Sequence, residues 1–148
     1  MIRMSRMRNT PVVCNDRQIG YLQGAKLDDG QKKVQAFVIA QGLKGKGLVY
    51  PEAVKVISEE FIIALCIAKY DRKFPVQNAS FAYDTDGLMI GIVSDYAVEE
   101  KTLSVEAIEV KRGYLPCERN DRIWFYRYSS SEHRKNDVIV PAYRYMSR

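Results

Sequence analysis

The chain has 148 residues, of which 47% are apolar, and it carries a formal charge of +5 at neutral pH. This length allows one ordinary domain or two small ones, and the apolar fraction is that of a folded protein. The longest apolar run, residues 61–68, is far shorter than the ~20 residues that cross a bilayer as a helix. The basic segment 1–8 is followed by no apolar stretch, so we expect a basic tail and not a signal peptide. These features predict a soluble protein without membrane insertion.

The three cysteines, Cys14, Cys66 and Cys117, are widely spaced, and no Cys-x-x-Cys pair occurs. This spacing argues against a zinc ribbon or a thioredoxin-like site. Cys14 and Cys66 lie in apolar, strand-like runs, so we predict that both are small buried residues. Such cysteine usage is typical of a reducing compartment, and the predicted localisation is therefore cytoplasmic.

An internal repeat organises the chain. Residues 19–42 recur without a gap, displaced by 71 positions, as residues 90–113. Glycines and apolar positions match in order, so that Gly20 corresponds to Gly91 and Gly42 to Gly113. Ordered matches over a whole hairpin indicate an internal duplication. Because one core is marginal at about 70 residues, we expect two modules, residues 9–70 and residues 74–145, that pack against each other.

In chain order, the first module is predicted to consist of short strands joined by turns. The expected strands are residues 11–14, 18–27, 34–40, 48–50 and 61–68, the last fully buried. Gly20 and Gly24 interrupt the second strand, which predicts a bulge, a sharp bend or a close approach of the backbone. Pro51 suits the first residue of a short helical turn, after which Val54 and Ile57 face the core.

A glycine-rich loop at residues 41–47 separates two of these strands. A phosphate-binding P-loop requires Gly-x-x-x-x-Gly-Lys-Ser/Thr before a helix, whereas Lys46 here is followed by Gly47 and a strand. This order excludes a nucleotide-binding loop. Two interpretations remain: a solvated loop, or a loop in which Lys44 and Lys46 contact a nucleic-acid backbone or an acidic protein.

The second module repeats the hairpin and then diverges. The expected strands are residues 88–98, 103–111, 123–128 and 137–142. Residues 84–87 resemble the start of a calcium loop, but apolar strand residues follow in place of oxygen ligands, so we predict a turn. The apolar pattern changes phase between Ala107 and Ile108, which predicts a bulge or burial on both faces.

Each copy resembles a PRC-barrel domain, the small β-barrel shared by the H subunit of purple photosynthetic reaction centres and the C-terminal half of the bacterial ribosome maturation factor. The motifs of the first copy are Ile19-Gly20, residues 28–30, residues 34–42, residues 49–57 and residues 61–65. The second copy carries Ile90-Gly91 and residues 105–113, but no Pro-led turn follows, so this module is degenerate or closes differently. The resemblance implies an all-β fold of two tandem PRC-type barrels that contact protein or RNA and have no catalytic residues.

The sequence shows no convergent catalytic set. The single histidine, His133, lies in a polar loop beside Ser131 and Glu132, and neighbours on such a loop do not form a preorganised site. The acid pairs at residues 28–29, 59–60 and 99–100 all fall at predicted turns, where they are solvated tips. We therefore predict no enzymatic activity, no metal site and no cofactor.

The stretch 122–128 alternates aromatic and basic residues. Along a strand, Ile123 and Phe125 share one face, and Trp124 and Tyr128 share the other. One face serves the core. The other face packs between the modules, binds a partner, or stacks on bases, and we favour the first of these alternatives.

We expect a non-enzymatic adaptor or assembly module that binds a protein. The alternative is RNA or ribosome-particle binding through a basic surface, and an unrecognised enzyme is the third hypothesis. The candidate partner-binding residues are Lys44, Lys46, Arg119, Arg122, Trp124 and Arg127. The charge of +5 fits solubility as well as an acidic partner, and a steep fall of binding with salt would favour RNA. The oligomeric state stays open.

Overall fold

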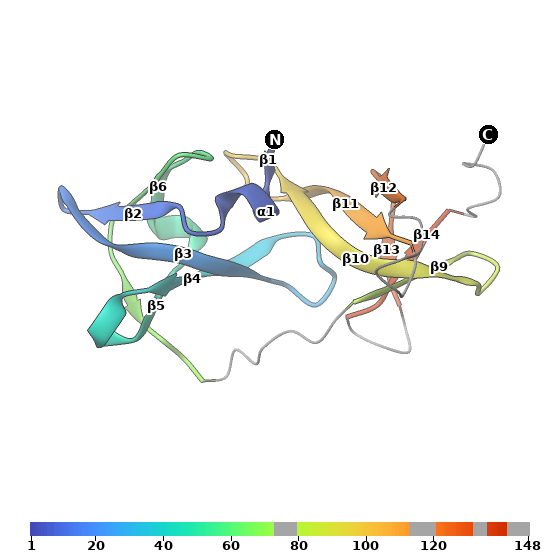
Figure 1. Ribbon diagram of the computed structural model, residues 1–148, viewed down its shortest axis with the longest axis horizontal. Coiled ribbons are helices and arrows are strands. Elements are labelled where there is room, and N and C mark those ends of the chain that lie inside the picture. The colour runs from blue at the N-terminus through green and yellow to red at the C-terminus, as the bar shows by residue number, and fades with distance from the viewer. Residues whose placement is uncertain (73–79, 113–120, 132–135, 142–148) are drawn as a thin grey trace.

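The computed structural model describes residues 1–72, 80–112, 121–131 and 136–141, which form an all-β protein with two curled sheets (Figure 1). The first sheet has the strand order β6-β7-β2-β3-β4-β5-β8. Its strands are β2 (Pro11–Cys14), β3 (Arg17–Leu27), β4 (Val34–Ala40), β5 (Lys46–Val49), β6 (Val54–Ile57), β7 (Ile62–Ala64) and β8 (Ala68–Lys69). The short helical turns η1 (Gly42–Lys44) and η2 (Pro51–Ala53) precede β5 and β6, which confirms the turn predicted from Pro51.

The second sheet has the strand order β12-β11-β10-β9-β14-β13, with β1 also paired to β10. Its strands are β1 (Ile2–Arg3), β9 (Phe81–Asp84), β10 (Met89–Val98), β11 (Val105–Lys111), β12 (Arg122–Phe125), β13 (Ser129–Ser130) and β14 (Val138–Val140). The predicted turn at residues 84–87 is confirmed, because the Asp84 carboxylate accepts the backbone N–H groups of Asp86 and Leu88, both at 2.9 Å. Burial on both faces of β11 is also confirmed, since Ala107 and Ile108 are both buried.

The two sheets share one topology. Each strand of the order β6-β7-β2-β3-β4-β5 has a counterpart in the order β13-β14-β9-β10-β11-β12. The pairs β2–β7 and β9–β14 are parallel, and the remaining pairs are antiparallel. This correspondence supports the duplication seen in the sequence. The sequence divergence after Gly113 leaves the strand order unchanged, and among the residues that the structure describes β8 of the first sheet and β1 of the second lack a counterpart.

Paired glycines allow a close approach of strands at equivalent places in both sheets. A Cβ atom on Gly20 would lie 2.2 Å from the carbonyl oxygen of Ala40, and one on Gly91 would lie 2.2 Å from that of Lys111. Neither position tolerates a side chain without movement of the backbone. Gly24 differs, since a Cβ there would meet nothing within 4 Å, and a register shift in the β3–β4 ladder at this residue confirms the predicted bulge.

The tip of the first hairpin joins the two sheets. The backbone N–H of Val34 donates to the Leu103 carbonyl at 3.0 Å, and the N–H of Val105 donates to the Lys32 carbonyl at 2.8 Å. One continuous hydrophobic cluster draws buried side chains from both sheets. The sheets are therefore held together by backbone hydrogen bonds and by a shared core.

Gln31 is the centre of a buried polar network at this junction. Its Nε2 donates to the Ser80 hydroxyl at 3.2 Å and to the Asn136 carbonyl. The Tyr96 hydroxyl donates to Gln31 Oε1 at 3.2 Å, and the Tyr128 hydroxyl donates to the Gln31 carbonyl. A network with its polar groups satisfied fixes the relative orientation of the packed elements. Tyr128 thus lies between the modules.

We expect Tyr128→Phe to lower the free energy of unfolding by about 1–2 kcal/mol, because the buried Gln31 carbonyl loses its donor. Burial also raises the pKa of Tyr128 above its usual value of 10.0. The folded state therefore keeps a proton that the unfolded state releases, so this stabilisation is complete below pH 10 and is lost as the pH rises further.

Urea unfolding at pH 7 and at pH 11 measures both effects. The wild type should lose more stability than Tyr128→Phe between these pH values. Burial also lowers the pKa of Lys32, but this residue is present in both proteins, so its contribution cancels in the comparison. The control is Tyr126→Phe, at a residue that is 67% exposed. Equal stability and equal pH dependence for wild type and Tyr128→Phe would show that the hydrogen bond from Tyr128 to Gln31 does not stabilise the fold.

The N-terminal segment is part of the fold, and the expectation of a basic tail is wrong. β1 pairs with β10, with Ile2 opposite Val98, and the short helix α1 (Met4–Met7) packs on β3 and β10. Met7 is fully buried. Arg3 and Arg6 interrupt the apolar residues of this segment, so the sequence shows no continuous apolar pattern there. None of the helices in the described ranges has the length and apolar character needed to cross a membrane.

Two predicted strands are shorter than their apolar runs. The prediction of one buried strand over residues 61–68 is wrong, because Leu65 and Cys66 are exposed between β7 and β8. The Leu65 N–H donates to the Ala53 carbonyl at 2.7 Å, which turns the chain so that β8 can reach β5. In the second sheet, β12 ends at Phe125, and Tyr126 is exposed.

Candidate functional site

The candidate partner-binding residues do not form one surface. Lys44 and Lys46 are exposed on η1 and at the start of β5, and Lys46 Nζ lies 5.5 Å from the centre of the Tyr70 ring. Arg122 and Arg127 belong to β12 and the segment after it, at the other end of the molecule (Figure 1). Arg119 lies outside the described residues. The candidate basic side chains that the structure describes therefore fall into two separate groups.

Trp124 contacts the N-terminal segment. The Arg3 guanidinium lies over the indole ring, 5.0 Å from its centre. Arg122 approaches the Glu109 carboxylate at 3.5 Å. These contacts tie Arg122 and Trp124 to groups of their own chain, so both have a structural role beside any role in binding.

Arg3 is the centre of a charge cluster that sequence reasoning missed. Its Nε donates to Asp95 at 3.2 Å and its Nη2 donates to Glu109 at 3.1 Å. The side chains of both acids are only 3% exposed. Asp95 also accepts the backbone N–H and hydroxyl of Ser5, and Ser94 donates to Glu109 at 2.8 Å. Arg3 is distant from both acids in sequence, so no local motif points to this cluster.

A groove runs along the outer side of β6, the strand that ends the order of the first sheet. Its volume is about 380 Å³, and its lining residues are Pro51, Val54, Lys55, Val56, Ile57, Glu100, Lys101 and Leu103. One wall is thus the edge strand of the first sheet, and the other is the tip of the β10–β11 hairpin from the second. Neither module alone forms the groove.

The second wall of the groove is held by a well-formed turn. The Glu99 carboxylate accepts the Thr102 N–H at 2.6 Å, the Thr102 hydroxyl at 2.8 Å and the Lys101 N–H at 3.0 Å. These hydrogen bonds, that from the Thr102 N–H first, hold the pKa of Glu99 below its usual range. The carboxylate therefore stays ionised and keeps the tip, with Lys101 and Leu103, in place.

Charge and exposure give this groove a definite chemistry. Lys55 and Lys101 are exposed, and with the single acid Glu100 they leave a net positive lining. Val56 is 40% exposed, although it lies in a strand. An edge strand presents unpaired backbone N–H and C=O groups that a further strand can accept. No described strand pairs with the outer side of β6.

The predicted acid pairs lie at turns. Asp28 accepts the Lys32 N–H at 2.8 Å, and residues 59–60 and 99–100 flank other turns. In the described ranges, no group of three or more His, Cys, Asp or Glu residues could hold a metal ion. Cys14 is buried as predicted, but Cys66 is exposed, which corrects the prediction for that residue. His133 and Cys117 lie outside the described residues.

No family model and no curated protein matches this chain. The chemistry that the chain can perform or bind is therefore inferred from its own geometry.

Proposed function

We propose that this chain is a non-enzymatic tandem of two PRC-type β-barrel modules that binds an extended segment of a partner protein along β6. The shared strand order, the equivalent close approaches at Gly20 and Gly91, and the Pro-led turn η2 support the assignment to the PRC-barrel family. The sequence motifs of that family cover the first copy of the repeat, and the second copy carries the hairpin motifs without the Pro-led turn. The proposed function involves no catalysis, because the paired acids lie at separate turns and do not converge on a common site.

The observation that carries the proposal is the groove between the β6 edge and the β10–β11 tip. Extended peptides bind to proteins by adding a strand to an exposed sheet edge. Backbone hydrogen bonds supply affinity in that mode, and adjacent side-chain contacts supply specificity. Here Val56 offers an apolar contact on the edge, and Leu103 lies on the opposite wall.

The charges of the groove select the partner. Lys55 and Lys101 line opposite walls, so an extended segment between them meets positive charge on both sides. Complementary charge raises association rates and fixes the register of the bound segment. The partner is therefore a protein with an extended, acidic segment, and the chain acts as an adaptor for it.

RNA or ribosome-particle binding is the alternative function. Its support is the exposed pair Lys44 and Lys46 on the glycine-rich loop, together with the charge of +5. These lysines lie outside the lining of the β6 groove. Separate variants can therefore test the two functions.

We expect Lys55→Glu/Lys101→Glu to lower capture of the partner protein from native lysate at least tenfold. The reason is that two attractive contacts become repulsive, each rim charge contributing about 0.5–1 kcal/mol. The full chain is used as bait, with and without nuclease, and captured proteins are quantified by mass spectrometry. All four lysines concerned are exposed, so the variants should fold.

The matched control is Lys44→Glu/Lys46→Glu, which makes the same charge change elsewhere. It should retain the partner. The opposite result has two parts: nuclease abolishes capture, and capture is lost in Lys44→Glu/Lys46→Glu but kept in Lys55→Glu/Lys101→Glu. That result would contradict peptide binding at β6 and support the RNA alternative.

A further inference from the structure

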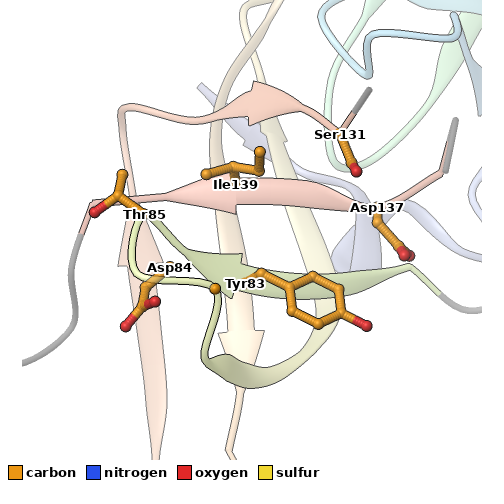
Figure 2. Close-up of a pocket in the computed structure, with 7 residues that line it drawn as sticks. Tyr83, Asp84, Thr85, Ser131, Asp137 and Ile139 are labelled. Carbon is orange, nitrogen blue, oxygen red and sulfur yellow. The ribbon is translucent and has the colours of Figure 1, made fainter. Parts of the chain in front are cut away.

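A second pocket, of about 390 Å³, lies beside the parallel strands β9 and β14 (Figure 2). Its lining residues are Tyr83, Asp84, Thr85, Gly87, Ser131, Asp137 and Ile139. All of them belong to the second module, so this pocket is separate from the β6 groove. Figure 2 shows the Tyr83 side chain extending along β9 toward the end at which Asp137 enters β14.

Asp137 is the unusual member of this lining. The residue is only 4% exposed, and its Oδ1 accepts the Phe81 backbone N–H at 3.0 Å. Its other oxygen, Oδ2, is buried, and within the described part of the chain no donor reaches it. A buried carboxylate oxygen without a donor is unfavourable by several kcal/mol unless a cation or a hydrogen-bond donor compensates for it.

The first module shows that the fold does not require an acid here. The register pairs Val12 with Ile62 in the first sheet and Ala82 with Val138 in the second, so Phe61 occupies the position that corresponds to Asp137. The two modules share one backbone hydrogen bond at this place. The Ser58 backbone N–H donates to the Phe61 carbonyl at 3.0 Å, and the Ser131 backbone N–H donates to the Asp137 carbonyl at 2.9 Å.

The backbone N–H group that Asp137 accepts, that of Phe81, is absent from the first module. Phe81 occupies the position of Pro11, which has no N–H to satisfy. Asp137 therefore compensates for an N–H that the first module lacks. That role uses Oδ1 alone and leaves Oδ2 without a function in the fold.

The other carboxylate of the lining is already engaged. Asp84 Oδ1 accepts the backbone N–H groups of the 84–88 turn, and in Figure 2 its side chain points away from Asp137. Among the other lining residues, the Tyr83 ring and the Ile139 side chain offer aromatic and apolar contact, beside Thr85, Gly87 and Ser131. A carboxylate beside an aromatic ring favours a cation, and the apolar wall favours an alkyl chain attached to it.

We propose that this pocket binds an alkylammonium group whose charged end reaches Asp137 Oδ2 and whose chain packs on Tyr83 and Ile139. A single free oxygen suits the compact point charge of an ammonium better than the two-pronged guanidinium. The group comes either from a free amine or from a lysine side chain of a partner. This site is independent of the function proposed for β6.

The test is a titration of the ¹⁵N-labelled full chain with butylammonium chloride, followed by amide chemical shifts. We expect saturable shifts at Tyr83, Ser131 and Ile139. The neutral isostere 1-butanol should bind at least tenfold more weakly, because it lacks the charge. Binding of 1-butanol as tight as that of butylammonium, or no saturable shift with either, would overturn the proposal without any variant.

Asp137→Asn tests the charge on the protein. The amide oxygen can still accept the Phe81 N–H, so the variant keeps the fold contact, while an uncharged NH2 group replaces the anionic Oδ2. We expect the affinity for butylammonium to fall at least tenfold. Asp16→Asn, at an exposed residue of the corresponding turn in the first module, should leave it unchanged. An unchanged affinity in folded Asp137→Asn would refute the site.

A capped Gly-Lys-Gly peptide distinguishes the two sources of the ammonium group. Tighter binding of this peptide than of butylammonium assigns the pocket to a lysine side chain of a partner. Binding that is equal or weaker assigns it to a free amine.

Discussion

Gly20→Ala should lower the free energy of unfolding by about 2–4 kcal/mol, a large effect for the addition of one methyl group. The added Cβ would lie 2.2 Å from the Ala40 carbonyl oxygen and 3.1 Å from a methyl group of Ile39. The nearer atom belongs to the backbone of the paired strand, so no rotation of a side chain relieves the clash. The β3–β4 ladder must open locally, which costs hydrogen bonds in the centre of the first sheet.

The control is Gly24→Ala, four residues further along the same strand, where a Cβ would meet nothing within 4 Å. That variant should unfold within about 1 kcal/mol of the wild type, since alanine restricts the unfolded chain without a clash. Urea denaturation of the three proteins measures the difference. A Gly20→Ala protein as stable as Gly24→Ala would refute the close approach, and with it the equivalence of Gly20 and Gly91.

Arg3→Met should lower the free energy of unfolding by about 2–4 kcal/mol. Methionine retains an apolar stem beside Trp124, so the change isolates the guanidinium charge. Its loss leaves the nearly buried carboxylates of Asp95 and Glu109 without their shared cation. Arg3 itself is about one-third exposed, so solvent screening keeps the effect below that of a fully buried pair.

Arg6→Met is the matched control, since Arg6 is 60% exposed and lies 4.0 Å from Glu59. A surface pair of this kind contributes about 0–1 kcal/mol. The same measurement on both variants separates a structural N-terminal segment from an attached tail. Equal unfolding midpoints for Arg3→Met and Arg6→Met would show that the segment contributes little to the fold.

The internal repeat and local turn chemistry make most of the strand order accessible from sequence. Gly20 and Gly91 mark equivalent close approaches, because only a residue without a side chain fits there, and Pro51 marks a helical turn, because its fixed φ suits the first helical residue. The apolar run at residues 61–68 misleads, because a turn at Leu65 interrupts it. That turn depends on a hydrogen bond from Leu65 to the Ala53 carbonyl, and no sequence motif predicts this contact.

The N-terminal segment and the buried acids depend on contacts between distant parts of the chain. Arg3 meets Asp95 and Glu109 only because β1 joins the second sheet, and pairing of so short a strand has no periodic signal. The β6 groove is similar, since its second wall comes from the β10–β11 tip. The candidate cations follow from composition alone, and the structure distributes those that it describes over two ends of the molecule.

Site-specific photo-crosslinking at position 56 tests the central claim, that a protein segment binds along β6. A photoreactive phenylalanine analogue replaces Val56, which is 40% exposed on the edge strand, and in a control protein replaces Tyr21, which is 50% exposed on β3. After irradiation in native lysate, we predict one nuclease-resistant protein adduct from position 56, crosslinked through an acidic segment, and none from position 21. Adducts that are equal at both positions, or that consist of RNA, would contradict the account.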